Sequence, residues 1–367
     1  MKGQRGAFSE SLRIVWAITA KDILDAIKNK NTLANIVIVF LLMAFYQMLP
    51  AWTHGSEPPN LLVYDAGHSS LLAALEDSSN VDLYQYRSQQ MMQEKLSGGD
   101  VIELGLVIPA DFDQVLASGE QPELEGYVIH WASEADASEL KLDVEREIAG
   151  LMGQPVRIKI SQERVYPQPE TYGRPFLTAV SLLLALTMAG MTVVPHLMID
   201  EKQAKTIDVL RVSPAKSVHV VIAKALTGLF YCLTAVVVVF AFNRALITHW
   251  GLAILTAAVG SLFTVALGLL LGTLFEVKQQ LSLWGFLLIS VLLMPVFLSI
   301  IVKALPLPEI VVTIIAWVPT VALSRVFQLS CSGSAPLGEF GPPLALVVGC
   351  TVLVLGAVVW AVRRAER

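Results

Sequence analysis

Cysteine is scarce in this sequence, and the few cysteines form no pattern. Only Cys232, Cys331 and Cys350 occur among 367 residues, far apart in the chain and outside any C-x-x-C pair. This scarcity excludes a small disulfide framework and a metal site built on paired cysteines.

A phosphate-binding loop is also missing, since no G-x-x-x-x-G-K-[ST] sequence occurs,. Residues 96–100, LSGGD, differ by one residue from the LSGGQ signature of ABC ATPases. In those enzymes the signature opens a helix whose N-terminus faces the nucleotide phosphate. Here a predicted helix runs into the glycines and a strand follows, so we interpret the match as a turn. The chain is not expected to be an enzyme.

Charged residues make up only 16% of the chain, against 54% hydrophobic residues. The mean hydropathy of +0.62 is too high for an ordinary soluble protein,. Apolar runs long enough to cross a hydrocarbon core of about 30 Å are residues 33–52, 176–197, 221–242, 251–275, 281–302 and 343–362. The first run lacks a signal-peptide cleavage site, so we expect it to be retained. These six runs predict six transmembrane helices.

Lysine and arginine are unevenly distributed around the predicted helices. They gather before residue 33, between the second and third runs, and after residue 362. The positive-inside rule then places both termini in the cytoplasm. No acidic residue lies well inside a run, which argues against the carboxylate relay of an ion-driven transporter,.

Residues 53–172 lie outside the membrane in this topology. They contain 21 Asp and Glu against 7 Lys and Arg, a balance opposite to that of a nucleic-acid-binding domain. Either the charges only keep the domain soluble, or they collect cations. The pattern predicts an α/β domain with strands at 60–65, 81–86 and 102–109 and helices at 69–77, 91–96, 111–116 and 134–152,.

The segment after the second run is densely charged. Residues 201–214, EKQAKTIDVLRVSP, combine mixed charges with a small apolar face, and Ser213-Pro214 breaks the predicted helix,. Ala223-Lys224 follows ten residues later. This pattern resembles the E-[KR]-x-x-G-T-[LI]-[DE]-x-L-x-x-[ST]-P motif of ABC type-2 exporter permeases, with Lys205 in place of the usual glycine.

The resemblance extends over the whole chain. Residues 106–129 resemble the external domain of the subgroup with a large insert after the first span, and residues 316–330 resemble its short external helices. The implied fold is membrane α-helical, with six transmembrane helices and an α/β domain inserted between the first two. The implied order begins with an N-terminal helix within 1–32, a first span at 33–52 and an external domain at 53–172. The other five spans lie within 173–362, followed by a tail at 363–367. The region 173–362 also contains a coupling segment at 198–219 and external helices at about 304–330.

The resemblance implies a permease without catalytic residues, cofactor or metal of its own. Two identical or homologous chains would form the transport path, and separate cytoplasmic ATPases would bind ATP and Mg²⁺. The implied residues for coupling to the ATPase are Glu201, Lys202, Thr206, Asp208, Leu210, Ser213 and Pro214. The other implied docking element is an amphipathic helix at 9–28, with Leu12, Val15, Trp16, Ile23, Leu24 and Ile27 against lipid headgroups and Lys21, Asp22 and Lys28 facing water,.

Within the spans, Gly260, Gly268 and Gly272 share one helix face that another helix can approach closely,. Contact within the chain is favoured over contact with a second copy. Pro295 is expected to kink the fifth run and to free a main-chain carbonyl. The resemblance lines the path with the second and fifth runs, which makes Met188, Met191, Met294, Pro295 and Phe297 candidates for a transport cavity,.

The expected cargo is an amphipathic drug-like, lipid-linked or cell-envelope compound. Two other hypotheses remain for the function. One is a secondary transporter driven by an ion gradient. The other is a membrane-anchored sensor or assembly protein in which residues 53–172 bind a ligand or an envelope partner.

Overall fold

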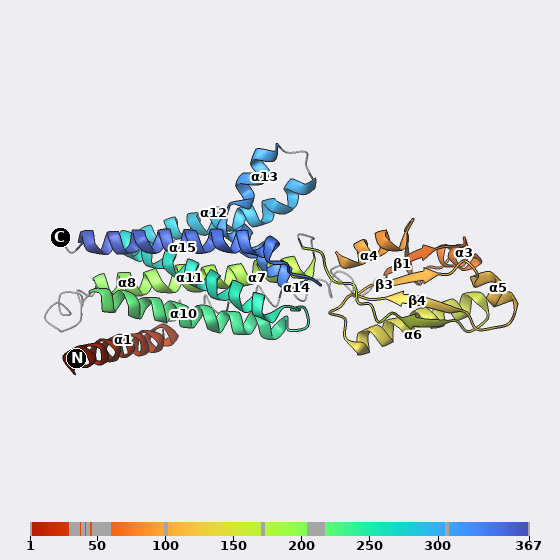
Figure 1. The fold of residues 1–367 in the computed structure, drawn as a ribbon, viewed down its shortest axis with the longest axis horizontal. Helices are drawn as coiled ribbons and strands as arrows, with labels where there is room; N and C mark the ends of the chain where they lie inside the picture. Colours follow the sequence, from red (N-terminus) through yellow and green to blue (C-terminus); the bar gives the residue numbers. More distant parts are fainter. Residues whose placement is uncertain are drawn as a thin grey trace. The chain divides into compact units, whose positions relative to one another are not determined.

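The computed structural model describes residues 2–28, 60–98, 102–169, 173–203, 217–304 and 308–365, and the single residues 37, 41 and 45. Two compact units make up the chain (Figure 1). The helical unit contains Met1–Ala44, Thr178–Ser330 and Ala335–Arg367, and the α/β unit contains Phe45–Leu177 and Cys331–Ser334.

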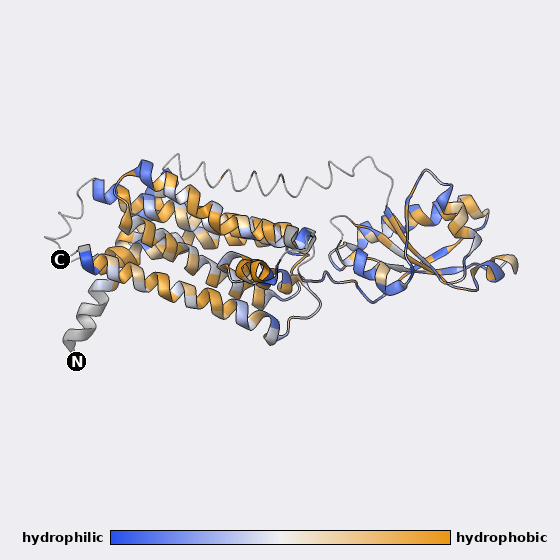
Figure 2. Ribbon diagram, turned by 90° about the horizontal axis from the view of Figure 1, so that it is seen from above, coloured by the Kyte–Doolittle hydropathy of each residue, from blue (hydrophilic) through white to orange (hydrophobic). Residues whose placement is uncertain are grey.

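The helical unit contains the apolar helices. Five of the described helices are long and apolar enough to cross a membrane. They are the continuous helix α7 (Arg174–Met188), η1 (Ala189–Val193) and α8 (Val194–Gln203), followed by α10 (Ser217–Phe242), α11 (Trp250–Leu274), α12 (Lys278–Ala304) and α15 (Leu337–Ala365). Figure 2 shows that their hydrophobic colouring runs along most of their length. They correspond to the predicted second to sixth spans, whereas the predicted first span, 33–52, lies outside the described residues except for three single positions.

Two short helices precede α15. Helix α13 (Glu309–Ala316) and helix α14 (Pro319–Cys331) meet at a bend of 80°. Proline suits the first position of α14 because its missing N–H has no partner there in any helix. Helix α13 has no buried residue, whereas Thr320, Ser324 and Gln328 are buried on one side of α14. The pair occupies the region predicted to hold short helices at 304–330.

Helix α11 and the continuous helix Arg174–Gln203 are the most buried of the long helices. Helix α11 packs against α8, η1, α10 and α15. Its glycines allow these close contacts. A methyl group added at Gly260 would lie 2.9 Å from Leu186, and one at Gly272 would lie 2.7 Å from the sulfur of Met198. A methyl group at Gly268 would overlap the main-chain oxygen of Gly190. The three glycines therefore face α7, η1 and α8 of the same chain.

A π-helical turn, η1, interrupts the first long helix of the unit. It ends at Val193, two residues before Pro195, which cannot donate a main-chain hydrogen bond,. Pro295 lies inside α12, and the Thr320 hydroxyl of α14 donates a hydrogen bond to the main-chain oxygen of Leu292. A neighbouring helix therefore binds a carbonyl at the predicted kink.

The α/β unit is built on a five-stranded sheet with the order β2-β1-β3-β4-β5. Strands β1 (Asn60–Asp65), β2 (Asp82–Gln85) and β3 (Leu104–Ile108) are parallel, and β4 (Glu123–Tyr127) runs antiparallel to β3. Strand β5 (Arg157–Ile160) is parallel to β4. Helix α4 (Gln89–Ser97) covers one face, and α6 (Glu134–Met152) packs with α3 (Ser70–Glu76) on the other (Figure 1). Helix α5 (Phe112–Ala117) follows β3.

The sequence pattern predicted three of these strands and missed β4 and β5. Both are short and show charged residues at alternate positions, Glu123 and Glu125 in β4 and Arg157 and Lys159 in β5. The main-chain N–H of Ile158 on β5 donates to Glu145 of α6 at 2.6 Å. A helix side chain therefore occupies a hydrogen-bonding position on this edge strand, which hinders pairing with another chain.

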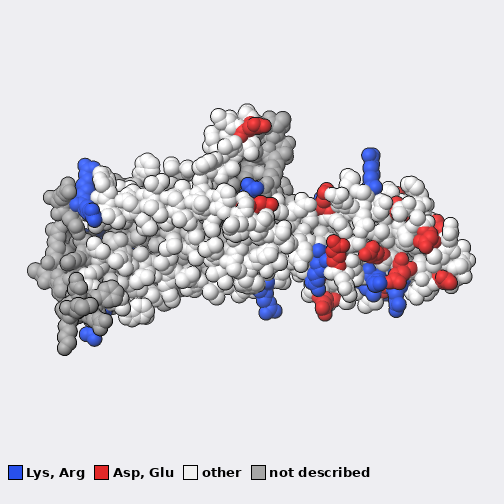
Figure 3. All heavy atoms as spheres, in the orientation of Figure 1, with Lys and Arg blue, Asp and Glu red and all other residues white. Residues whose placement is uncertain are grey.

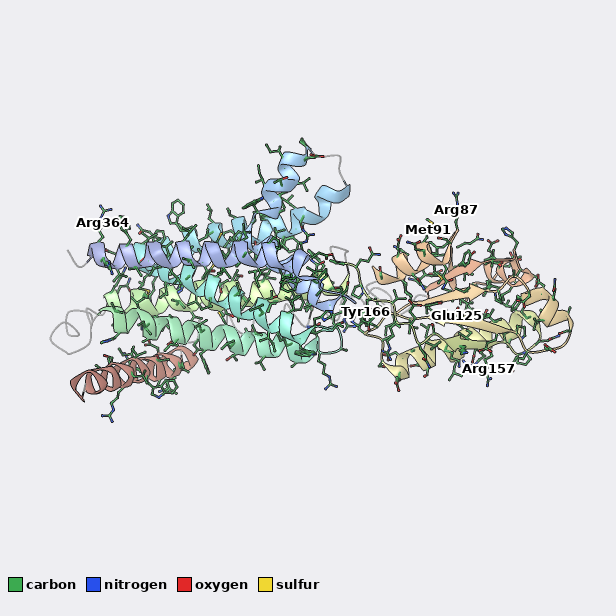
Figure 4. The ribbon with its side chains drawn as sticks, viewed as in Figure 1. Arg87, Met91, Glu125, Arg157, Tyr166 and Arg364 are labelled. Atoms are coloured by element: carbon green, nitrogen blue, oxygen red, sulfur yellow. The ribbon has the colours of Figure 1, made fainter. Side chains whose placement is uncertain are left out.

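Charge distinguishes the surfaces of the two units. The face in Figure 3 has a long stretch of helical unit without acidic or basic side chains, whereas Asp, Glu, Lys and Arg are spread over the α/β unit. In Figure 4, Arg87, Met91 and Arg157 extend from the outside of that unit. Helix α4 ends at Ser97, so the LSGG sequence begins at the end of a helix, as predicted, and not at its start.

The Gly190–Gly268 contact gives a stability prediction. We expect Gly268→Ala to lower the stability of the folded chain by about 3 kcal/mol, because the added methyl group meets main chain that cannot rotate away,. Thermal unfolding in lipid nanodiscs measures the effect. Gly349→Ala on α15 is the control, since nothing lies within 4 Å of its added methyl group. If Gly268→Ala and Gly349→Ala have equal unfolding temperatures, α11 and η1 can move apart without loss of stability.

Candidate functional site

The end of α8 is the most connected polar region of the helical unit. Asp200 forms an ion pair with Lys278 of α12, and Glu201 forms one with Lys224 of α10. Lys202 donates to the main-chain oxygens of Thr273 and Phe275 at 3.0 and 3.1 Å. Gln203 donates to the main-chain oxygen of Glu276 at 3.3 Å. We call the seven side chains Asp22, Asp200, Glu201, Lys202, Gln203, Lys224 and Lys278 the α8 junction.

Helix geometry explains why four consecutive residues contact different partners. Each residue is rotated by about 100° from the one before, so four in a row point almost all the way around the helix. Because α8 ends between α10, α11 and α12, each direction meets a different neighbour. The last turn of α8, which lies within the predicted coupling segment 198–219, is therefore fixed from several sides.

Lys224 is the most buried charge of the junction. Its ammonium group lies 2.7 Å from Asp22 Oδ2 of α1 (Lys2–Lys28) and 2.7 Å from Glu201 Oε1. The Lys224 side chain is 1% exposed, that of Asp22 3% and that of Glu201 14%. A buried ammonium group requires such partners, since an unpaired charge in an apolar interior is very costly. Lys224 therefore joins three helices.

Further hydrogen bonds hold α1 on α10. The Tyr231 hydroxyl of α10 donates to the main-chain oxygen of Ile23 at 2.7 Å. The Thr19 hydroxyl lies 2.9 Å from the main-chain oxygen of Val15 and 3.4 Å from that of Ala223. These contacts lie on the α10 side of α1 together with Asp22.

The prediction that Asp22 faces water is wrong. The amphipathic pattern placed Asp22 on the water-facing side with Lys21 and Lys28, but the ammonium group of Lys224 makes a buried position favourable for this carboxylate. Burial raises the pKa of Asp22, and the charge of Lys224 partly opposes that rise. Lys21 and Lys28 are exposed, as the pattern predicted.

The side of α1 away from α10 remains partly apolar. Leu12, Trp16 and Leu24 are more than half exposed, whereas Val15 and Ile23 are partly buried. Arg13 and Lys21 are exposed beside this apolar surface. An exposed apolar strip flanked by basic residues is typical of a helix that lies at a membrane surface.

Lys202 meets the end of another helix. The main-chain oxygens of the last turn of a helix have no partners within that helix, and they form the negative end of its dipole. The amine of Lys202 donates to two such oxygens at the end of α11. The bond holds α8 and α11 together at one end, and the glycine contacts hold them together along their length.

Only two of the predicted coupling residues lie within the described residues. Glu201 and Lys202 are both in the α8 junction. Thr206, Asp208, Leu210, Ser213 and Pro214 lie in the segment 204–216, outside the described residues. Their role in coupling stays a prediction.

The residues proposed for a transport cavity occupy different environments. Met191 is buried in η1, and Met188 is partly buried beside it. Met294 and Phe297 are exposed on α12, on either side of the partly buried Pro295. The role of these five residues in transport stays a prediction. Among the described residues, no three His, Cys, Asp or Glu side chains are grouped as metal ligands.

Sequence analysis did not identify Asp22 and Lys224 as an ion pair. The sequence contained one signal for it, because Lys224 lies three residues inside the predicted run 221–242. A charged residue inside a membrane span is rare and needs a partner. Nothing in the sequence indicates that this partner lies 202 residues away on α1.

Removal of the Lys224 charge should lower the stability of the α8 junction. We expect Lys224→Met to lower stability by about 3–5 kcal/mol, because it leaves the buried Asp22 carboxylate without its cation,. Thermal unfolding, together with tryptic cleavage of α1, measures the loss. Lys278→Met is the control, since that half-exposed ion pair should contribute less than about 1 kcal/mol,. Similar losses in both variants would contradict a special role for Lys224.

The pH dependence of the same variant gives a second prediction. Without Lys224, the pKa of Asp22 rises further above its ordinary value of 3.8. The folded chain then holds a proton that the unfolded chain releases, so the free energy of unfolding increases as the pH falls toward the ordinary pKa of the carboxyl group. We expect Lys224→Met to recover part of its lost unfolding temperature as the pH is lowered from neutral toward this ordinary value of 3.8,. The double variant Asp22→Asn, Lys224→Met should show no such recovery, and equal recovery in both variants would assign it to another group.

Comparison with known families identifies the chain. A family model described as "ABC-2 family transporter protein" matches residues 30–360, which include all of the α/β unit and most of the helical unit. No individual curated protein matches the chain. The long match agrees with the apolar helices and with the resemblance carried by residues 201–224. The chain is a multi-pass membrane protein of the ABC-2 transporter family, the family of ABC transporter permeases.

Proposed function

We propose that this chain is the membrane-spanning subunit of an ABC exporter, driven by ATP hydrolysis on separate ATPase subunits. The observation that carries the proposal is the α8 junction, where the residues before segment 204–216 bind α10, α11 and α12, and through Lys224 also α1. A force on this segment acts on several helices at once. Membership of the ABC-2 family supports an ATPase partner.

In this proposal segment 204–216 is the surface that receives the ATPase. Glu201 and Lys202 anchor its first end, and Thr206, Asp208 and Leu210 contact the ATPase. Ser213-Pro214, which the sequence predicts to break a helix, comes shortly before α10 begins at Ser217,. ATP and Mg²⁺ bind to the partner, because this sequence has no loop for nucleotide phosphates,.

The proposed orientation has both termini and segment 204–216 in the cytoplasm of a bacterial cell. The basic residues of α1, of segment 204–216 and of the end of α15 support it,. At the end of α15, Arg364 lies 5.3 Å from the ring of Trp360, and Figure 4 shows Arg364 near the C-terminus. An exposed tryptophan beside arginine is typical of a helix end at a membrane surface,. The α/β unit then lies outside the cytoplasm, where it is available to an envelope partner.

The proposed path forms between two permease chains, identical or homologous. The exposed apolar faces of α12 and α15 in the single chain supply surface for lipid and for a second chain. The cargo class that fits such a path is an amphipathic drug-like, lipid-linked or envelope compound. Met188, Met191, Met294, Pro295 and Phe297 remain the proposed residues along it.

ATP hydrolysis by the reconstituted pair tests this function. We expect the chain in nanodiscs to be inactive alone, and to support ATP hydrolysis with the ATPase encoded nearest to it. Leu210→Asp should lower the stimulated rate by at least about tenfold, since a charge replaces the apolar contact in the proposed interface and 1.4 kcal/mol of lost interaction corresponds to a factor of ten.

Leu142→Asp is the matched control, because Leu142 is exposed on α6 of the α/β unit. It should leave both ATPase binding and ATP hydrolysis unchanged. A well-folded chain that binds no candidate ATPase, or an ATPase pair indifferent to Leu210→Asp, would contradict the proposal.

A further inference from the structure

The chain enters α7, the start of an apolar span, beside a tryptophan. Arg174 is the first residue of α7 and of the apolar helix Arg174–Gln203. The central carbon of its guanidinium group lies 4.6 Å from the centre of the Trp131 ring, in the segment between β4 and α6. A cation–π contact of this kind attracts the positive charge to the face of the indole. It gives the N–H groups of Arg174 no oxygen acceptor.

The guanidinium group of Arg174 has no anionic partner within the part of the chain that the structure describes. No described residue forms an ion pair or a hydrogen bond with it. Asp136 of α6 acts on Arg174 through its charge, but it forms no ion pair with it and is exposed. Arg174 itself is partly buried between the buried residues Gly173 and Pro175. Because burial removes water from a charged group, this position favours an anion that comes from outside the chain.

The indole of Trp131 is a second donor without an acceptor. Trp131 is 7% exposed, and its N–H group is buried without a hydrogen-bond partner among the described residues. An indole nitrogen can only donate. Buried donors in native proteins are completed by an acceptor, since an unmatched donor costs free energy. Arg174 and Trp131 together therefore provide donors alone, and the ligand chemistry that matches donors alone is an anionic oxygen group.

The residues beside Trp131 add another arginine and another aromatic pair. His130 stacks on Tyr166 with 5.0 Å between the ring centres. Arg164 donates to the main-chain oxygen of His130 at 3.1 Å. Arg164 and Tyr166 are exposed, and Tyr166 lies at the end of the α/β unit away from α5 (Figures 1 and 4). Aromatic and basic side chains of this kind are typical of a surface that meets lipid headgroups.

We propose that Arg174, held by the ring of Trp131, binds a phosphate group at the membrane surface. The first residue of a membrane span lies at the depth of the lipid headgroups, where phosphate is the abundant anion. A guanidinium group matches two phosphate oxygens at once. Arg174 is the binding residue and Trp131 the positioning residue. The phosphate belongs either to a phospholipid headgroup or to a free phosphate in solution.

This inference requires that α7 begins a membrane span, which the apolar helix and the family support. It does not depend on the ATPase or on the coupling segment. Failure of the proposed function would therefore leave it intact, and its own failure would leave the proposed function intact.

Native mass spectrometry of the full chain, titrated with phosphatidylglycerol in detergent, tests the site. We expect Arg174→Gln to weaken the retention of one phospholipid at least about tenfold, because hydrogen bonds to a charged group are lost. Arg174→Lys should keep part of the affinity, since it keeps the charge but not the planar fork. Arg157→Gln is the matched control, because Arg157 is exposed on β5 and extends from the outside of the α/β unit (Figure 4). It should leave retention unchanged.

Variants of the neighbouring residues separate binding from folding. Trp131→Phe keeps an aromatic face and should retain more phospholipid than Trp131→Leu, which removes it. Asp136→Asn should strengthen binding by about two- to fivefold, since it removes the carboxylate that competes for Arg174,. A loss of stability alone would not raise the affinity. This increase is measurable even if Arg174→Gln fails to fold, and unchanged or weaker binding by Asp136→Asn would count against an anion site.

Two further titrations decide the source of the phosphate. A galactolipid without phosphate should show no retention that depends on Arg174. Displacement of phosphatidylglycerol by excess inorganic phosphate would show that the site binds phosphate by itself, whereas retention in its presence would assign the site to the phospholipid headgroup. Equal retention of phosphatidylglycerol by the wild type and Arg174→Gln would overturn the inference. Equal retention of the galactolipid and phosphatidylglycerol by the wild type would do the same.

Discussion

A buried ammonium group controls the arrangement of one end of the helical unit. Lys224 lies inside an apolar helix, where its charge is tolerated only with negative partners close by,. Asp22 and Glu201 provide them from two other helices. The N-terminal helix, the end of α8 and the start of α10 are thereby held at one point. The need to neutralise one charge thus joins segments that are distant in the sequence.

The remaining contacts of α8 extend this connection to the rest of the unit. Asp200 and Lys202 bind the start of α12 and the end of α11, while Gly268 and Gly272 let α11 approach η1 and α8 closely. Close main-chain contact leaves little room for sliding, so the helices along this face are expected to move as packed bodies. Under the proposed function, such an arrangement suits the transmission of force from an ATPase, because the segment proposed to bind the ATPase follows directly after α8.

The α/β unit is stabilised in a different way. Its core is formed mainly by buried aliphatic residues on both faces of a mixed sheet, and most of its charges are at the surface, although Asp65 and Glu103 are buried. The helical unit instead has exposed apolar side chains on α12 and α15, which suit contact with lipid or with another chain. The same chain therefore contains one part suited to water and one part suited to a membrane.

Local patterns in the sequence were enough to predict the helices and strands whose formation depends on neighbouring residues. Long apolar runs predicted five described spans, and alternating or periodic residues predicted α3 to α6 and three strands. Strands β4 and β5 were missed because they are short and half charged, and they become strands by pairing with β3 and with each other. The glycine spacing on α11 indicated a close helix contact, but only the structure identified Gly190 and Met198 as parts of that contact. The burial of Asp22 was decided by tertiary structure alone, since a carboxylate on an amphipathic helix faces water unless a distant part of the chain brings a cation to it.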